Sequence, residues 1–357
     1  MPPGPGLPEA LGWCLGYFLT CQLLLAIPAV IAVRLLGEAA LGREPTKPET
    51  MVAVTGVMQV LSVGVTLAAF RLRCGRLGKL QFGLPSLPAT VAALYSLPAA
   101  VAACSMWGFA AGAAWRALCE AAPGLEVLDD MSSLSAVGSM METVPLPILL
   151  LTVAVCPAVV EELFCRGLIG RGVVARWGVW PGVLLTSILF CGLHLHPAHA
   201  AALLPIAVLM HVSYLASRSL WLPIGLHFAN NAFAVCMQKF TLSETGELPD
   251  PHAAHPLTES PWLLAALWVG TTAVAAIGIW AVWSVRVRFV EWDADGRPGG
   301  ELSSRWPTVE PPPASADAAA TVRWELPPLV AFAVTVIPLA ALMAISLISA
   351  LVFGLPG

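Results

Sequence analysis

Six polar residues lie in stretches of the chain that are otherwise apolar, and their types are those that activate water or stabilise developing charge. A carboxylate beside a histidine can act as a general base, and fixed nitrogen donors can stabilise an oxyanion. An ionisable side chain within an apolar helix costs free energy unless it is paired or hydrated, so each of these residues is a candidate for function. They are Glu161, Glu162, Arg166, His194, His227 and Asn231.

The two adjacent glutamates are expected to have different surroundings. Residues four apart share a face of a helix, whereas neighbours diverge by about 100°. Glu162 therefore pairs with Arg166, and Glu161 points elsewhere, free to face a cavity. Alternatively, both carboxylates belong to one structural ion cluster at a helix end.

Chain geometry places Glu161 and His194 at the same distance from the turn that joins their two helices. Each lies 16 residues from the expected turn at Trp177 and Gly178, on two consecutive antiparallel helices. A single histidine in an apolar helix is more often a packing residue, and the level placement beside a buried glutamate favours a functional role for His194. His211 has no such partner, and we predict that it packs in the core.

His227 and Asn231 are four residues apart and share one face of a later helix. Their depth is close enough to that of Glu161 and His194 for one cavity to hold all four. Asn230 lies off this face and fits a hydrogen bond between helices. The same interhelical role is the alternative for His227 and Asn231.

Three short patterns carry these residues in order: Glu161-Glu162-x-x-x-Arg166, Phe190-x-x-x-His194 and His227-x-x-x-Asn231. Together they resemble the CAAX-protease and bacteriocin-processing family of intramembrane endopeptidases, over about 146–238. The run SRSLWLPIGLHFANN (217–231) is similar to the family's last motif in its flanks as well. The resemblance implies that Glu161 and His194 hold and deprotonate the attacking water and that His227 and Asn231 stabilise the oxyanion. It leaves an orienting role to Glu162 and Arg166.

A metal-free mechanism is the interpretation we favour, with no cofactor. Glu161, His194 and His227 could instead supply three zinc ligands with an open fourth position. The His-Glu-x-x-His pattern of common zinc proteases does not occur in the sequence. His196 and His199 follow His194 closely, and we interpret them as interfacial residues because their spacing directs them to different faces.

The composition indicates an all-α, polytopic membrane protein that positions these motifs on transmembrane helices. Of 357 residues, 58% are hydrophobic and 11% are charged, whereas a soluble domain has about 25% charged residues. The mean hydropathy is +0.80. Uncharged stretches of about 20 residues, enough to cross roughly 30 Å of hydrocarbon, predict nine spans. These are 10–33, 51–70, 87–115, 146–165, 180–200, 201–217, 219–238, 262–284 and 327–353.

The expected organisation has five parts. They are N-terminal helices (1–145), the motif-bearing core (146–238), an outer loop with the eighth span (239–284), a small cytoplasmic insertion with a strand pair and a linker (285–326), and the last span (327–357). Most Lys and Arg residues fall in the connections that are cytoplasmic if the N-terminus is inside. This favours a topology with the N-terminus inside. Because the chain is rich in Ala, Pro and Leu, as in many prokaryotic proteins, we expect the bacterial inner membrane as its location.

The function expected from the resemblance is hydrolysis of a peptide bond in a membrane-associated or lipidated protein or peptide. The net charge of −4 leaves no basic surplus for nucleic acid, so the expected partners are such a substrate and the lipid bilayer. A catalytically silent scaffold or immunity-type protein of the same fold is one alternative. A proton-coupled transporter is another, although no internal repeat is evident.

Overall fold

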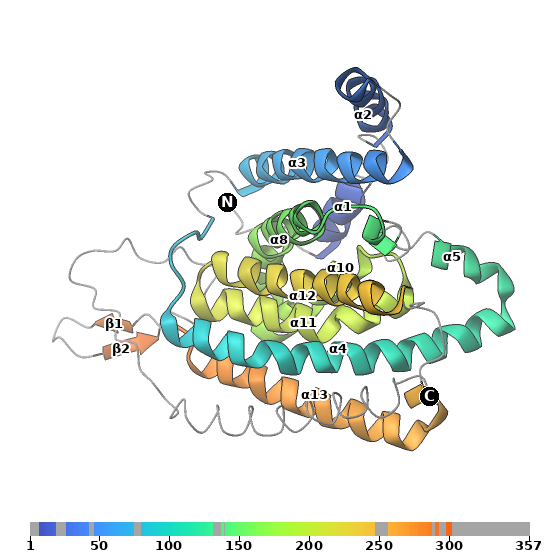
Figure 1. The fold of residues 1–357 in the computed structure, drawn as a ribbon. Coiled ribbons are helices and arrows are strands. Elements are labelled where there is room, and N and C mark those ends of the chain that lie inside the picture. Colours follow the sequence, from blue (N-terminus) through green and yellow to red (C-terminus); the bar gives the residue numbers. More distant parts are fainter. Residues whose placement is uncertain are drawn as a thin grey trace.

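The structure is a computed structural model in which helices dominate (Figure 1). It describes residues 7–18, 26–42, 46–74, 80–130, 137–138, 140–246, 256–287, 290–292 and 298–301. The expected last span, 327–353, and the linker in the second half of the insertion lie outside the described residues.

The first helices of the chain precede the motif-bearing segment. They are α1 (Leu7–Phe18), α2 (Ala26–Leu41), α3 (Lys47–Cys74), α4 (Leu87–Ala121), the 3₁₀ turn η3 (Pro123–Glu126) and the short α5 (Val127–Asp130).

The motif-bearing segment begins with one long helical stretch, Leu146–Trp177, in which two π-helical stretches interrupt the α-helix. Its parts are α7 (Leu146–Leu149), η4 (Leu150–Val155), α8 (Cys156–Glu162), η5 (Leu163–Gly170) and α9 (Arg171–Trp177). The elements that follow are α10 (Val179–Gly192), α11 (Pro197–Ser217), α12 (Trp221–Thr245), η6 (Pro256–Glu259) and α13 (Pro261–Ser284).

Five helical stretches among the described residues are long and apolar enough to cross a membrane, where the sequence predicted nine spans. The segment expected as one first span contains two helices, α1 and α2, and the segment expected as 180–200 ends as a helix at Gly192. The five stretches are Glu49–Cys74, Leu87–Ala121, Leu146–Trp177, Pro197–Ser217 and Pro261–Ser284.

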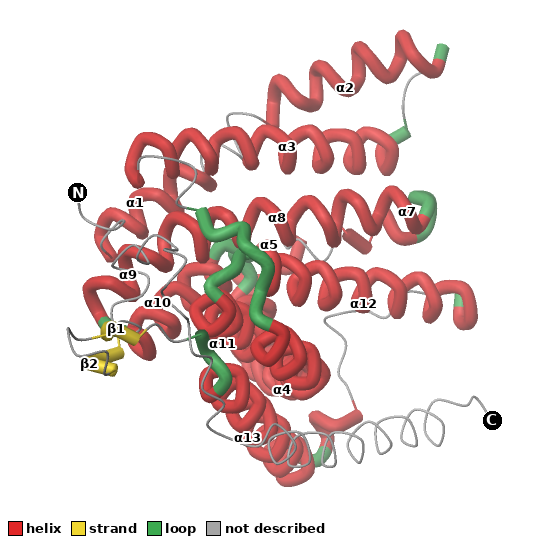
Figure 2. Tube along the Cα trace, turned by 90° about the vertical axis from the view of Figure 1, so that its left-hand side faces the viewer, coloured by secondary structure: helices red, strands yellow, loops and turns green. Residues whose placement is uncertain are grey.

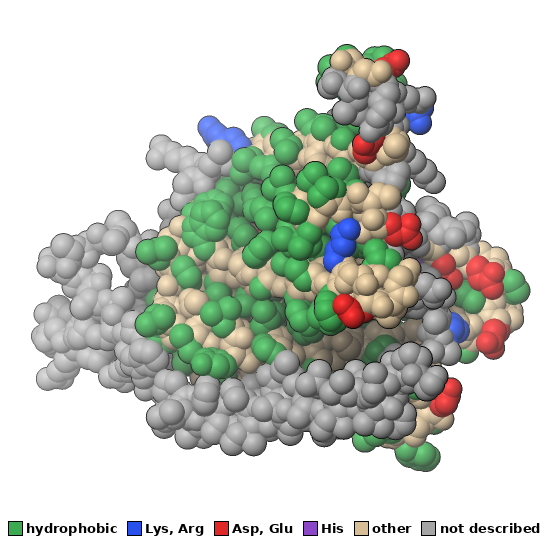
Figure 3. Space-filling view, in the orientation of Figure 1, with side chains coloured by type: hydrophobic (Ala, Val, Ile, Leu, Met, Phe, Trp, Pro, Cys, Tyr) green, Lys and Arg blue, Asp and Glu red, His purple; other side chains and the backbone are tan. Residues whose placement is uncertain are grey.

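The outer surface is apolar in the way that a membrane-embedded bundle requires. Large hydrophobic side chains point outward from several helices, among them Leu94, Ile188 and Val269, each at least half exposed. Figure 3 shows hydrophobic side chains across one face, with acidic side chains gathered near the far end of α4. In water such a surface would be costly, and in lipid it is not. The protein is therefore an integral membrane protein.

The helices pack in a layered arrangement around α11. Figure 2 shows α3, α8 and α12 side by side, and α8 contacts both of its neighbours. On the other side, α11 packs against α4 and α13, and α10 packs against both α9 and α11. Much of α11 is buried, so this helix forms the centre of the bundle.

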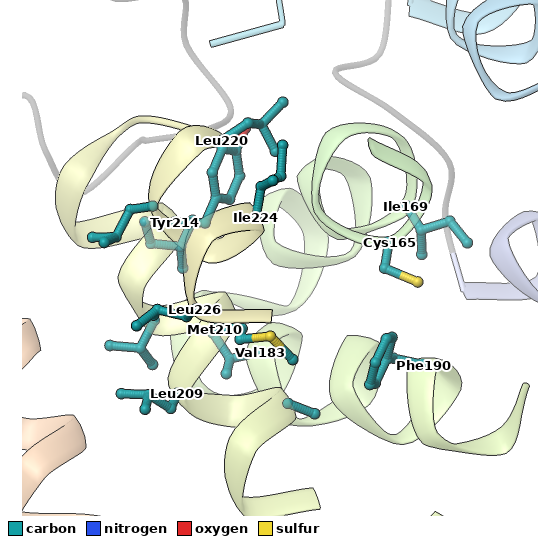
Figure 4. Packing of buried hydrophobic residues seen from close by; sticks show 14 of the residues in the cluster. Cys165, Ile169, Val183, Phe190, Leu209, Met210, Tyr214, Leu220, Ile224 and Leu226 are labelled. Atoms are coloured by element: carbon teal, nitrogen blue, oxygen red, sulfur yellow. The ribbon is translucent and has the colours of Figure 1, made fainter. Parts of the chain in front are cut away.

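The core forms where α10, α11, α12 and η5 meet. Figure 4 shows part of it, with Val183, Phe190, Leu209, Met210 and Leu226 among the buried side chains. Arg166 is as buried as these apolar residues, at 0% exposure. The Arg166 side chain is thus enclosed by the main hydrophobic core.

Two glycines explain why the helices can approach and turn here. Gly178 has a φ of 83°, a conformation that favours glycine, and it forms the turn between α9 and α10 that the sequence predicted. Gly170 lies against α11, where a Cβ atom would be 2.9 Å from two ring atoms of His211. The missing side chain therefore lets η5 pack closely on α11.

Two short strands form the predicted strand pair in the first half of the insertion. Strand β1 (Val290–Trp292) pairs with β2 (Pro298–Glu301) in antiparallel fashion, with a register irregularity between Glu291 and Trp292.

Candidate functional site

A buried charge network joins the first and third motifs. Glu162 and Arg166 both have side chains that are 0% exposed, and Arg166 Nη1 donates to Glu162 Oε1 at 2.8 Å. His227 Nδ1 lies 3.0 Å from the same carboxylate oxygen. Arg166 also donates from Nη2 to the backbone carbonyl of Ala207 on α11 at 2.9 Å. The predicted ion pair is present, and it includes His227 as a third member that the sequence did not indicate.

This network fixes the orientation of the His227 ring. A carboxylate only accepts hydrogen bonds, so His227 donates from Nδ1 to Glu162. The opposite nitrogen, Nε2, then faces Glu161, whose Oε2 is 3.9 Å away. Because that distance is too long for a direct hydrogen bond, the pair is suited to a bridging water.

Glu161 differs from its neighbour in accessibility, as the helical geometry predicted. Its side chain is 25% exposed, whereas that of Glu162 is fully buried. Glu162 contacts the Arg166 guanidinium and the His227 imidazole. Glu161 has one oxygen near His227 Nε2 but makes no direct hydrogen bond to it. Of the two carboxylates, only that of Glu161 is accessible to solvent.

Phe190 connects His194 with the rest of the site. The Arg166 guanidinium lies over the Phe190 ring, 4.6 Å from its centroid. The same ring makes edge contacts with His194 and His227, at centroid distances of 5.3 and 5.8 Å. The second motif therefore supplies both the histidine and the aromatic ring that packs against the other two motifs.

His194 itself lies in a turn after α10, not within a helix as expected. Pro197 begins α11, and the residue before a proline avoids the helical conformation, so His196 is extended. Leu195 has a φ of 60°, which breaks the helix between the two elements. His194 Nδ1 lies 3.3 Å from the carbonyl of Phe190. Its approach to Glu161 through a water stays a prediction.

Asn231 is held by a backbone carbonyl to which Pro157 cannot donate. Pro157 has no N–H to donate to the carbonyl four residues earlier, that of Val153. Asn231 Nδ2 donates to this carbonyl at 3.2 Å, and Asn230 donates to Asn231 Oδ1 at 3.1 Å. Asn231 therefore ties α12 to η4.

The other histidines have distinct surroundings. His211 is fully buried, as predicted for a packing residue. His196, expected at an interface, is buried and contacts Asp129 at 2.8 Å. His199 contacts the ring of His194 at a centroid distance of 5.1 Å.

The residues named for a possible zinc site are not assembled as a ligand set. Within the described part of the chain, no group of three or more His, Cys, Asp or Glu side chains is arranged to hold a metal ion. His227 contacts Glu162 through Nδ1, and its Nε2 lies 3.9 Å from Glu161 Oε2.

The sequence did not predict two contacts near the site, that of Asn231 with the Val153 carbonyl and that of His196 with Asp129. The Val153 carbonyl could have been inferred from its position four residues before Pro157. The contact between Asp129 and His196 joins residues 67 apart in the sequence, and no spacing rule indicates it.

One comparison with known proteins agrees with the family resemblance that the three motifs indicated. Residues 143–233 match a family model described as Type II CAAX prenyl endopeptidase Rce1-like. Searches of curated proteins and of solved structures returned no match. The matched segment contains all six candidate residues and runs from just before α7 to the middle of α12.

Proposed function

We propose that this protein, whose segment 143–233 matches the Type II CAAX prenyl endopeptidase Rce1-like model, is an intramembrane endopeptidase of the CAAX-protease and bacteriocin-processing family. It hydrolyses a peptide bond of a membrane-associated or lipidated protein or peptide. The observation that carries the proposal is the accessible Glu161 carboxylate, 3.9 Å from His227 Nε2 and adjacent to a fully buried ion pair.

In the proposed mechanism Glu161 takes a proton from a water molecule as the water oxygen attacks the substrate carbonyl. His194 holds the water, and Glu161 then delivers the proton to the leaving amine. A carboxylate in a site with little water can serve as such a base. The partial exposure of Glu161 supports this role, because Glu162 has no comparable access.

The oxyanion that forms in the tetrahedral intermediate is stabilised by His227 and Asn231. For this role His227 faces the oxyanion with Nε2, while its Nδ1 is held by Glu162. Asn231 uses the Nδ2 hydrogen that is not directed at Val153. Donors held in fixed positions stabilise developing charge strongly.

Glu162 and Arg166 act as orienting residues. Their ion pair sets the direction of the His227 ring through Nδ1, and Arg166 links α11 to the site through Ala207. The proposed mechanism uses no metal ion. The proposed topology places the N-terminus and the β1–β2 pair in the cytoplasm, in a bacterial inner membrane.

The experiment that tests the function compares membranes from cells that express the wild-type protein with membranes from cells that express Glu161→Gln. Shortened membrane proteins or peptides should be found only with the wild type. Glu120→Gln, which changes an exposed glutamate on α4, is the matched control and should resemble the wild type. Identical peptide profiles for the wild type and Glu161→Gln would favour the catalytically silent alternative.

A purified assay then defines the substrate class. The protein in detergent is incubated with a farnesylated cysteine peptide that has a three-residue C-terminal extension, and with the same peptide without the lipid. Cleavage of the farnesylated peptide alone would show that the lipid is required for recognition. Equal cleavage would show that the peptide segment suffices.

A further inference from the structure

Three residues from separate elements meet beside the turn that carries His194. Trp115 lies near the end of α4, Asp129 lies in α5, and His196 precedes α11. Asp129 Oδ1 accepts from Trp115 Nε1 at 2.8 Å and lies 2.8 Å from His196 Nε2. The Trp115 and His196 rings are also in edge contact, with centroids 5.2 Å apart. We call these three residues the Asp129 cluster.

The contacts determine the tautomer and the orientation of His196. Because a carboxylate accepts and does not donate, His196 carries its proton on Nε2 and donates to Asp129. Its Nδ1 accepts from the backbone N–H of His199 at 3.3 Å and thereby caps the first turn of α11. Both ring nitrogens are thus used, and the His196 ring is fixed at 2% exposure.

The fixed ring constrains the turn that holds His194. The backbone N–H of His196 donates to the carbonyl of His194 at 2.7 Å. Between them Leu195 adopts a φ of 60°, which is costly for a residue with a Cβ atom and persists only where the surroundings hold it. The direction of the His194 ring therefore depends on where the His196 side chain is anchored.

We infer that Asp129 and His196 are positioning residues, which hold the turn 193–196 so that His194 faces the reacting water. The inference rests on the proposed function, since it assigns a task to His194. It adds residues that lie outside the three motifs, and Asp129 and Trp115 lie outside the segment that matches the family model. Asp129 and Trp115 act through His196 and do not contact the substrate.

Four variants separate the parts of the cluster. Asp129→Ala removes the acceptor, and Asp129→Asn keeps an acceptor oxygen without the charge. His196→Asn keeps a side chain that can cap α11 and is too short to reach Asp129. Trp115→Phe keeps the aromatic contact and removes the N–H donor. Glu126→Gln, in the preceding 3₁₀ turn and exposed, is the matched control.

Peptide hydrolysis is measured as kcat and KM with each variant. Asp129→Ala and His196→Asn should lower kcat about 10- to 100-fold, the size expected when a reacting group is displaced slightly, with KM little changed. Asp129→Asn should recover part of the loss, and Glu126→Gln should match the wild type. In a double-mutant cycle, Asp129→Ala combined with His196→Asn should lose no more than either alone. Additive losses, or wild-type kcat in Asp129→Ala, would overturn the inference.

A second measurement does not depend on activity. In protein labelled with ¹⁵N-histidine, the ring signals of His194, assigned with His194→Gln, should shift in Asp129→Ala and stay unchanged in Glu126→Gln. If the wild type cleaves no peptide while this shift is present, the proposed function fails and the anchoring of the turn stands. If the His194 signals are unchanged in Asp129→Ala, the positioning role is wrong whatever the enzyme cleaves.

Discussion

Replacing Arg166 by methionine should destabilise the protein far more than replacing a surface arginine. Arg166 and Glu162 are both 0% exposed, and their 2.8 Å contact is worth about 6 kcal/mol of Coulomb energy at an effective dielectric constant of about 20. The desolvation of the two charges costs a similar amount, so the pair as a whole contributes little net stability. Arg166→Met removes the attraction and leaves the Glu162 carboxylate buried, which costs about 3–5 kcal/mol.

The free energy of unfolding of the purified protein, measured by denaturant titration in detergent micelles, checks this value. Arg176→Met is the control, because Arg176 is exposed on the next helix, and its effect should stay within about 0.5 kcal/mol. The double variant Glu162→Gln with Arg166→Met removes both charges and should be more stable than Arg166→Met alone. Equal losses for Arg166→Met and Arg176→Met would refute the reasoning.

Three further predictions concern the metal, the packing and the topology. Peptide hydrolysis should survive extensive chelation, since no ligand set has to be filled; loss of activity that returns with added zinc would contradict this. Gly170→Ala should destabilise the protein by about 1–3 kcal/mol, because the new methyl group would meet His211, whereas Gly225→Ala, with open space around it, should not, as unfolding measurements would show. Cysteines introduced at Arg76 and Glu247 should be labelled from opposite sides of the membrane; labelling of both from one side would refute the topology.

Local geometry predicted the parts of the site that lie on one helix. The four-residue spacing of Glu162 and Arg166 predicted their ion pair. The 100° angle between adjacent helical residues predicted that Glu161 has different surroundings from Glu162, and Glu161 is the more exposed of the two. The turn at Gly178 followed from a glycine between two apolar segments, and the structure confirms it. These features depend on helical periodicity, which can be read from the spacing of residues along the sequence.

Features that depend on contacts between distant elements could not be predicted in the same way. The bond from His227 to Glu162 depends on how α12 packs against α8, which spacing within one helix does not determine. The turn at His194 arises because Pro197 and the left-handed Leu195 together end α10, and a single sequence did not indicate the second of these. The Asp129 cluster joins three elements across the bundle.

The central claim is that Glu161, and not Glu162, meets the reacting water, and paired measurements of activity and stability on two variants test it most directly. Glu161→Gln should lower kcat by about 10²–10⁴-fold, the usual contribution of a general base, while leaving the free energy of unfolding nearly unchanged. Glu162→Gln should lower that free energy, because Arg166 then lacks its buried partner. A Glu161→Gln variant that keeps wild-type kcat would contradict the account.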